Sequence, residues 1–326
     1  MRALSLLMLI GFVSLTSCKT EAVYVKSEQS KRKDTADLEK PEIKSDLEDV
    51  GVHNLPNGDK YIGGFKNRKK HGEGEYLYKS GEKYKGAFAG GVYNGYGEHI
   101  LVDGTKYIGE FKDGLREGIG SLFLVSGDRY EGQFHADLMH GEGVYRFTDE
   151  KEYRGNFVKG VRHGKGIMIF PSGAEYEGSF QNDKMNGKGK MRYKNGNEYE
   201  GDFIDGKREG MGVLRKSNGD TYSGTFLANA AHGKGKYTFA NGDEYTGAVK
   251  MEKLTGKGVL TKKNGDIYKG ELLDGVYHGV GKLTGQNGSV LYGVWHHGKL
   301  TKQLPEPESE LEDEPIESHE EELEED

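Results

Sequence analysis

The chain has 326 residues, among them 52 Gly, 20 Tyr, 13 Phe, 6 Pro and 1 Cys, and its formal net charge is −7. The low Pro content excludes collagen, and the many aromatic residues argue against a flexible glycine linker. A single Cys excludes an internal disulfide framework, and abundant Gly disfavours helices because each Gly costs about 1 kcal/mol relative to Ala there.

The amino terminus has the features of an export signal. Arg2 precedes an apolar stretch from Ala3 to Thr16. As a helix this stretch would span about 21 Å, too short for a hydrocarbon core of about 30 Å. The sequence therefore predicts a signal peptide over residues 1–17. Residues 15–18, Leu-Thr-Ser-Cys, resemble the bacterial lipobox, in which cleavage precedes a Cys that becomes lipid-modified.

The lipobox resemblance implies a membrane anchor. Cys18 would carry acyl chains such as palmitate, and two or three chains on one residue anchor firmly. The expected location is the bacterial cell envelope. Lys19 replaces the Asp that retains enterobacterial lipoproteins at the inner membrane, which favours the outer membrane. The alternative is an ordinary signal peptide in which Cys18 has no role.

Two charged segments flank the middle of the chain. Residues 18–55 mix both signs and contain few aromatic residues, which predicts a flexible tether. Residues 301–326 are predicted to be an acidic disordered tail, because thirteen acidic residues and no Lys or Arg follow residue 302. Residues 56–302 carry a net charge of +7. We therefore expect the tail to fold back on the basic middle and compete with an anionic partner.

The middle section, residues 56–300, is an internal repeat with a period of 23 residues. Tyr recurs ten times, and Leu291 takes the eleventh place. Gly follows each of these positions by two residues, and a large apolar residue follows by four. A Gly-x-Gly element comes next at the same interval. The Tyr positions are 61, 84, 107, 130, 153, 176, 199, 222, 245 and 268.

Each unit is predicted to form two antiparallel strands. Tyr61, Gly63 and Phe65 alternate and so lie on one strand face, and the Gly-x-Gly element begins the second strand. The Asn-Gly pairs, such as Asn195-Gly196, predict the short hairpin turn. The other connection, residues 111–118 in one unit, is predicted to be about six residues long with a left-handed residue. Bare Gly surfaces leave room for the rings to lie flat.

The predicted fold class is all-β: an elongated, single-layer antiparallel β-meander solenoid of about eleven 23-residue hairpins. Such a sheet would have about 22 strands and, at about 4.8 Å per strand, a length of roughly 100 Å. Sheets of that size twist, and each unit contacts only its neighbours.

The repeat resembles the MORN repeat, with residues 176–196 as a close fit from Tyr-x-Gly-x-Phe through Gly-x-Gly to Asn-Gly. The resemblance covers about residues 57–300. It is interrupted at Thr148-Asp149-Glu150, where the Asn-Gly turn is missing, and in the last units, where the aromatic rows lapse. MORN repeats generally serve protein association, dimerisation or membrane attachment, often beside a catalytic domain. This resemblance implies an interaction module without an activity of its own.

The aromatic row allows two interpretations. Its rings form the thin core, or part of the row stays open as a groove for a peptide, glycan or lipid. The candidate binding residues on this face are Tyr107, Phe111, Tyr130, Phe134, Tyr153, Phe157, Tyr176, Phe180, Tyr199 and Phe203.

Other chemistry is weakly supported by the sequence. Gly-x-Gly lacks the helix and the Lys of a phosphate-binding loop. A row of His residues, including His140 and His163, would space its members about 10 Å apart, too far to share a metal ion, which favours turn hydrogen bonds. No catalytic residues, cofactor or metal are predicted.

The leading hypothesis is a non-enzymatic, lipid-anchored envelope protein whose array is a scaffold for a protein partner or for self-association. The alternative is direct binding of the basic array to anionic lipid head groups. A second alternative is an envelope or cell-wall enzyme. Nucleic acid is not an expected partner, because the chain carries an export signal and an acidic tail.

Overall fold

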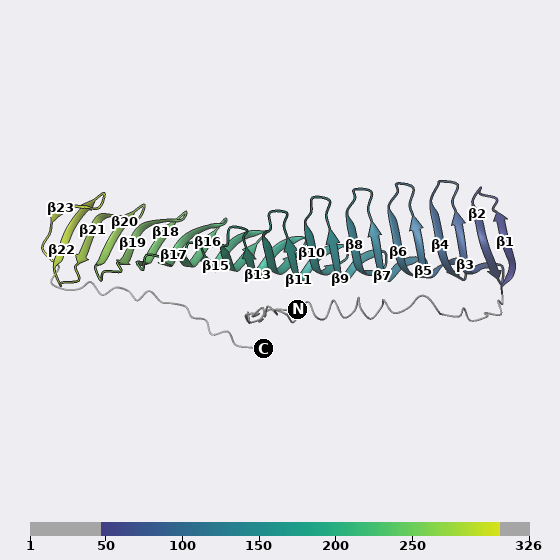
Figure 1. The fold of residues 1–326 in the computed structure, drawn as a ribbon, viewed down its shortest axis with the longest axis horizontal. Coiled ribbons are helices and arrows are strands. Elements are labelled where there is room, and N and C mark those ends of the chain that lie inside the picture. The colour runs from purple at the N-terminus through teal and green to yellow at the C-terminus, as the bar shows by residue number, and fades with distance from the viewer. Residues whose placement is uncertain (1–46, 307–326) are drawn as a thin grey trace, which may run out of the picture. The chain divides into compact units, whose positions relative to one another are not determined.

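The structure is a computed structural model that describes residues 47–306. These residues form one antiparallel sheet of 23 strands and contain no helix. Each strand pairs with the strands before and after it in the chain, as Figure 1 shows for the row from β1 to β23. The sheet twists along its length (Figure 1). The predicted all-β meander of two-stranded units is therefore confirmed.

Short and long strands alternate along the sheet. The even-numbered strands have seven residues, and those from β2 to β20 carry the Tyr of the repeat; the odd-numbered strands from β3 to β21 have nine and carry Gly-x-Gly. The strands are β1 (Glu48–Asn54), β2 (Lys60–Lys66), β3 (Lys69–Leu77), β4 (Lys83–Ala89), β5 (Val92–Ile100), β6 (Lys106–Lys112), β7 (Leu115–Phe123), β8 (Arg129–His135), β9 (Leu138–Arg146), β10 (Glu152–Val158), β11 (Val161–Ile169), β12 (Glu175–Gln181), β13 (Lys184–Arg192), β14 (Glu198–Ile204), β15 (Lys207–Arg215), β16 (Thr221–Leu227), β17 (Ala230–Thr238), β18 (Glu244–Lys250), β19 (Lys253–Thr261), β20 (Ile267–Leu273), β21 (Val276–Thr284), β22 (Val290–His296) and β23 (Lys299–Gln303).

The two kinds of turn are the reverse of the prediction. The connection after the Phe has only two residues: in β12–β13, Gln181 pairs with Lys184 across Asn182-Asp183. Both turn residues are left-handed, with φ of 48° and 68°, which is the type I′ geometry that suits the twist of antiparallel strands. The expected six residues were too many because strand pairing continues up to the turn itself.

The Asn-Gly turn is the longer connection, with five residues between β13 and β14. Only Gly196 is left-handed there, and its N–H donates a hydrogen bond of 2.9 Å to the Tyr193 carbonyl. The Tyr193 N–H bonds in turn to the Asn197 carbonyl at 2.9 Å. This is a type I turn closed by a left-handed residue. The Asn197 side chain accepts the Ser217 N–H at 2.9 Å and so ties one turn to the next.

The two glycines of each Gly-x-Gly element have different roles. The first lies in a bulge: between the pairs Gly178–Gly189 and Phe180–Met185, three residues of β13 face one residue of β12. Gly187 in this bulge has φ of 81°, so alternation breaks there. The second glycine lies under a ring, since a Cβ on Gly189 would come within 2.5 Å of the Tyr176 hydroxyl oxygen. The expectation that rings lie flat on glycine is confirmed for this row.

Both ends of the array are half-units. β1 pairs with β2 through Gly51–Gly63 and His53–Tyr61, the register by which β3 pairs with β4. The strand covers most of the last residues that the sequence analysis placed in the tether, so the sheet begins earlier than predicted. At the other end β23 has five residues and pairs only with β22.

Candidate functional site

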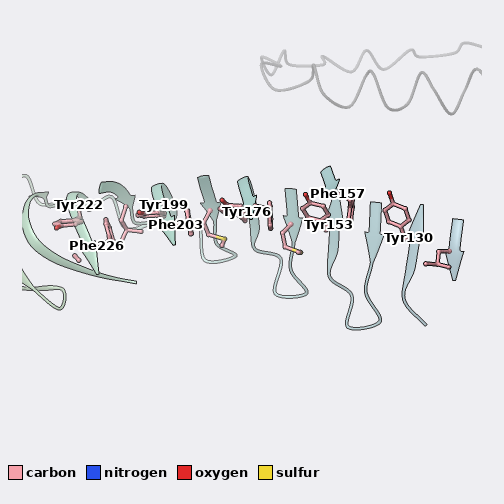
Figure 2. Close-up of a cluster of buried hydrophobic side chains, with 14 of the residues drawn as sticks. Tyr130, Tyr153, Phe157, Tyr176, Tyr199, Phe203, Tyr222 and Phe226 are labelled. Carbon is pink, nitrogen blue, oxygen red and sulfur yellow. The ribbon is translucent and has the colours of Figure 1, made fainter. Parts of the chain in front are cut away.

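The ten candidate binding residues lie in the core. All ten side chains are between 0% and 4% exposed. They are Tyr107, Phe111, Tyr130, Phe134, Tyr153, Phe157, Tyr176, Phe180, Tyr199 and Phe203. We call the face that carries them the ring face. The groove interpretation does not fit this geometry, because these rings are closed to a ligand. Figure 2 shows Tyr130, Tyr153, Tyr176 and Tyr199 following one another across the sheet.

The ring face closes itself within a single layer. The Tyr176 ring meets Phe180 of its own strand edge-on at 5.2 Å between centroids and Phe203 of the next unit at 4.9 Å. Its hydroxyl donates a hydrogen bond of 2.9 Å to the Ser179 carbonyl. Burial raises the pKa of Tyr176 to about 12. Each Tyr therefore joins two units and has its polar end satisfied.

A row of longer side chains lies over the rings. The Arg208 guanidinium lies 5.4 Å from the centre of the Tyr199 ring and 5.3 Å from that of Phe226. The Arg162 guanidinium lies over the Tyr153 ring in the same way. Its Nε–H donates a hydrogen bond of 2.9 Å to the carboxylate of Asp183, which lies in the next two-residue turn. Such contacts cover the core and link neighbouring units.

The opposite face carries an exposed group of apolar side chains that we call the apolar patch. It consists of five residues on alternate strands β5, β7 and β9, which lie about 10 Å apart at about 4.8 Å per strand. Their side chains are between 44% and 64% exposed. The patch residues are Val92, Tyr96, Leu115, Ile119 and Leu138. Neighbouring units thus repeat an apolar residue at equivalent places on an exposed face.

A shallow depression of about 520 Å³ adjoins the apolar patch. Ile119, Gln133 and Phe134 contribute to its lining. At its rim the Glu117 carboxylate accepts the Ala136 N–H at 3.0 Å and lies 3.0 Å from the His135 ring nitrogen. These hydrogen bonds, the backbone one first, lower the pKa of Glu117. The patch therefore has polar groups held in place at its border.

The His row shows no metal-binding arrangement. Across residues 47–306, no group of three or more His, Cys, Asp or Glu is placed to hold an ion. The predicted turn hydrogen bonds are not made by the Nδ1 atoms of His232 and His278, which are buried without a partner. The backbone takes part instead, since the His278 carbonyl accepts the Tyr268 hydroxyl at 3.1 Å. No helix in the described part of the chain is long and apolar enough to cross a bilayer.

The fold and the surface define a β-repeat protein: a sheet with one closed face and one variable face. The MORN repeat family matches ten consecutive segments that cover most of the chain, and the chain belongs to this family. The matched segments are residues 61–83, 84–106, 107–129, 130–151, 153–175, 176–198, 199–221, 222–244, 245–267 and 268–290. The eleventh unit of the prediction is not matched, although it supplies β22. Its Leu291 is 41% exposed where the Tyr residues are buried.

Other comparisons give distant likenesses. No curated protein matches the chain. Among solved structures, the TCP10 domain of Danio rerio CPAP in complex with a peptide of Danio rerio STIL is similar at 9% identity and a TM-score of 0.38, over 74% of this chain and 96% of that one. The TCP domain of Drosophila melanogaster SAS-4, in complex with a proline rich motif of Ana2, has 16% identity and a TM-score of 0.29, over 54% of this chain and 90% of that one. Virginiamycin B lyase from Staphylococcus aureus has 10% identity and a TM-score of 0.14, over 76% of this chain and 84% of that one.

The apolar patch was missed by the sequence analysis. The repeat is defined by the positions at which the units agree, whereas the patch lies at positions where the units differ. The row of Tyr96 and Ile119 continues with Glu142, Lys165 and Lys188 in the following units. Comparing the row of Tyr96 and Ile119 for departures from its charged majority would have revealed these two residues.

Proposed function

We propose that this protein is a non-enzymatic scaffold that binds a partner protein through the apolar patch and is held at the bacterial cell envelope by lipidated Cys18. The patch is the observation that supports the binding role. Val92, Leu115 and Leu138 are each at least 44% exposed, and with Tyr96 and Ile119 they place five exposed apolar side chains on three alternate strands. Exposed apolar groups gathered in this way are typical of protein-binding surfaces.

The composition of the patch suits a protein partner. Tyr96 is 64% exposed, and tyrosines at the centre of an interface often dominate its binding energy. The paired Glu117 and His135 would contribute to a polar rim. Because the core lies on the other face, a partner can cover the patch without disturbing the fold.

The binding role can be tested with matched substitutions in one row. Ile119→Glu places a charge in the patch, and Met211→Glu does the same four units away, where the side chain is 55% exposed. After cross-linking in intact cells, we expect Ile119→Glu to lose the partner and Met211→Glu to retain it. Equal capture by the two variants would contradict the proposal. Sedimentation of the purified proteins shows whether the partner is a second copy, in which case only Met211→Glu remains associated.

The anchor is proposed from the lipobox resemblance, and residues 1–46 lie outside the described part. Lys19 supports an outer-membrane location. We expect radiolabelled palmitate to be incorporated by the full chain and not by Cys18→Ser, and membrane fractionation to place the label in the outer membrane. Label in Cys18→Ser, or a soluble wild-type protein, would contradict the anchor.

A second candidate function is direct binding of anionic lipid head groups. Lys234, Lys250 and Lys257 make no ion pair within residues 47–306 and are available to an anion. Flotation with phosphatidylglycerol vesicles would test this on a chain that lacks residues 1–46, because a longer truncation would remove β1. Failure to float at low salt would reject lipid binding by the array.

A further inference from the structure

The opposite face of β17–β21 is strongly basic. We call the seven lysines on these five strands the lysine face; only Glu244 and Glu271 on the same strands oppose them. All seven alternate with the apolar residues of the ring face. They are Lys234, Lys236, Lys250, Lys253, Lys257, Lys269 and Lys282. Lys269 stands directly opposite Lys282 across β20–β21, which concentrates positive charge at this end of the face.

The chain leaves the sheet toward this face. Beyond β23 the Leu304 N–H still bonds to the Tyr292 carbonyl of β22, at 2.9 Å. Two residues later Glu306 forms an ion pair with Lys282 on β21. The first acidic residue of the tail thus crosses β22 and meets the lysine face.

The sequence beyond this contact continues the same pattern. Glu occupies positions 306, 308, 310, 312 and 314, and Pro307 favours an extended backbone. In an extended segment alternate side chains point the same way, so these carboxylates would project to one side about 6.6 Å apart. Residues 307–326 lie outside the described part of the chain.

We propose that the acidic segment 306–314 binds the lysine face of its own chain in extended form. The strands β17 and β21 are about 19 Å apart at about 4.8 Å per strand. Eight residues beyond Glu306 reach about 26 Å, enough to pass Lys257 on β19 and Lys234 on β17. Flexible lysine side chains accommodate the difference in spacing between the carboxylates and the strands. An anionic ligand of this face must then displace the segment.

Amine acylation of the full-length protein, followed by mass spectrometry, tests the contact. We compare E308Q/E310Q/E312Q with E320Q/E321Q/E322Q, which has the same net charge. In E308Q/E310Q/E312Q, the proximal variant, the reagent should acylate Lys234 and Lys257 several-fold faster than in wild type. In E320Q/E321Q/E322Q, the distal variant, the rates should match wild type. Lys165 on β11 takes the same place in its unit as Lys234 does on β17, and its acylation rate should be unchanged in both variants. High salt should remove the difference by screening.

Equal acceleration in both variants would overturn the proposal, because it would show a net-charge effect, and so would acceleration in neither. A carbodiimide cross-link on a mixture of nitrogen-15-labelled and unlabelled protein identifies the chain that supplies the tail. We expect peptides 307–314 to link to Lys257 of the same isotope only. Mixed-isotope links would assign the tail to a neighbouring copy and would also overturn the proposal. Circular dichroism checks that the variants keep the sheet.

Discussion

The ring face and the opposite face are formed by the same strands, yet they vary differently along the chain. On the ring face the ten Tyr side chains from Tyr61 to Tyr268 are all between 0% and 2% exposed. On the opposite face one row reads Tyr96, Ile119, then Glu142 and Lys165, and so changes from apolar to charged within a few units. The backbone tolerates this variation because that face contributes little to the core.

The difference separates folding from recognition. A residue on the ring face is fixed by a ring and a glycine on adjacent strands, so one exchange disturbs two units. A residue on the opposite face has solvent beside it and is free to differ. The apolar patch near β5–β9 and the lysine face at β17–β21 are two results of that freedom on one scaffold.

The largest expected effect is alkaline unfolding driven by the ring face. Burial raises the pKa of Tyr153 and Tyr222 to about 12, above the ordinary value of 10.0. Because the folded pKa is the higher one, this contribution to stability is complete below pH 10 and is lost as pH rises toward 12. Tyrosinate absorbance should therefore rise together with loss of the β-sheet circular dichroism signal. Complete ionisation with the sheet intact would contradict the closed ring face.

The next largest effect is expected from Gly189→Ala. The new Cβ would lie 2.5 Å from the Tyr176 hydroxyl oxygen, so the ring must move, at a cost of about 3 kcal/mol. Its neighbour Lys190 points to the opposite face and pairs with Glu198 at 3.0 Å, so Lys190→Ala should cost less than about 1 kcal/mol. Urea unfolding compares the two. Equal shifts would remove the distinction between the faces.

A smaller loss is expected for Tyr176→Phe. The change removes the hydroxyl and leaves the Ser179 carbonyl without its donor, which costs about 1–2 kcal/mol. The control Tyr193→Phe, at a half-buried ring whose hydroxyl makes no hydrogen bond in the described part, should stay within about 0.5 kcal/mol. Thermal melting of both variants measures the difference. A loss as large for Tyr193→Phe would contradict the role given to the buried hydroxyl.

The smallest effect is expected on the opposite face. Ile119→Ser and Met211→Ser alter side chains that are 49% and 55% exposed, so stability should change by no more than about 0.5 kcal/mol. Melting temperatures close to wild type would show that the patch is not needed for folding. A clear destabilisation by Ile119→Ser would mean that it belongs to the structural core.

The strands were predictable because alternation and a strict period both appear in the sequence. The turns were not, because conformation depends on position in the hairpin as well as residue type. Asn182-Asp183 forms the two-residue type I′ turn without any glycine, whereas the Asn-Gly pair lies in the longer connection. Arg68 and Glu252, which belong to residue types that rarely adopt positive φ, have φ of 59° and 67° in the equivalent turns, because a type I′ turn requires positive φ at both central residues.

The first half-unit was also missed, for a related reason. Gly51 and His53 keep the spacing of Gly74 and Tyr76 one period later, but without a Tyr or Phe in this strand the match was not visible. The candidate site required the structure in a different way. The buried state of Tyr176 follows from contacts among three strands, and the exposure of Ile119 follows from which face of the sheet is closed.

The constant unit of 23 residues makes the array adjustable in length. Every unit begins and ends at the same point of the hydrogen-bond ladder, so removing or adding one whole unit restores pairing between equivalent strands. Each such step changes the length by two strands, about 10 Å. In a protein of this design the number of units sets the length of the array, and the sequence of each unit sets which side chains its exposed face displays.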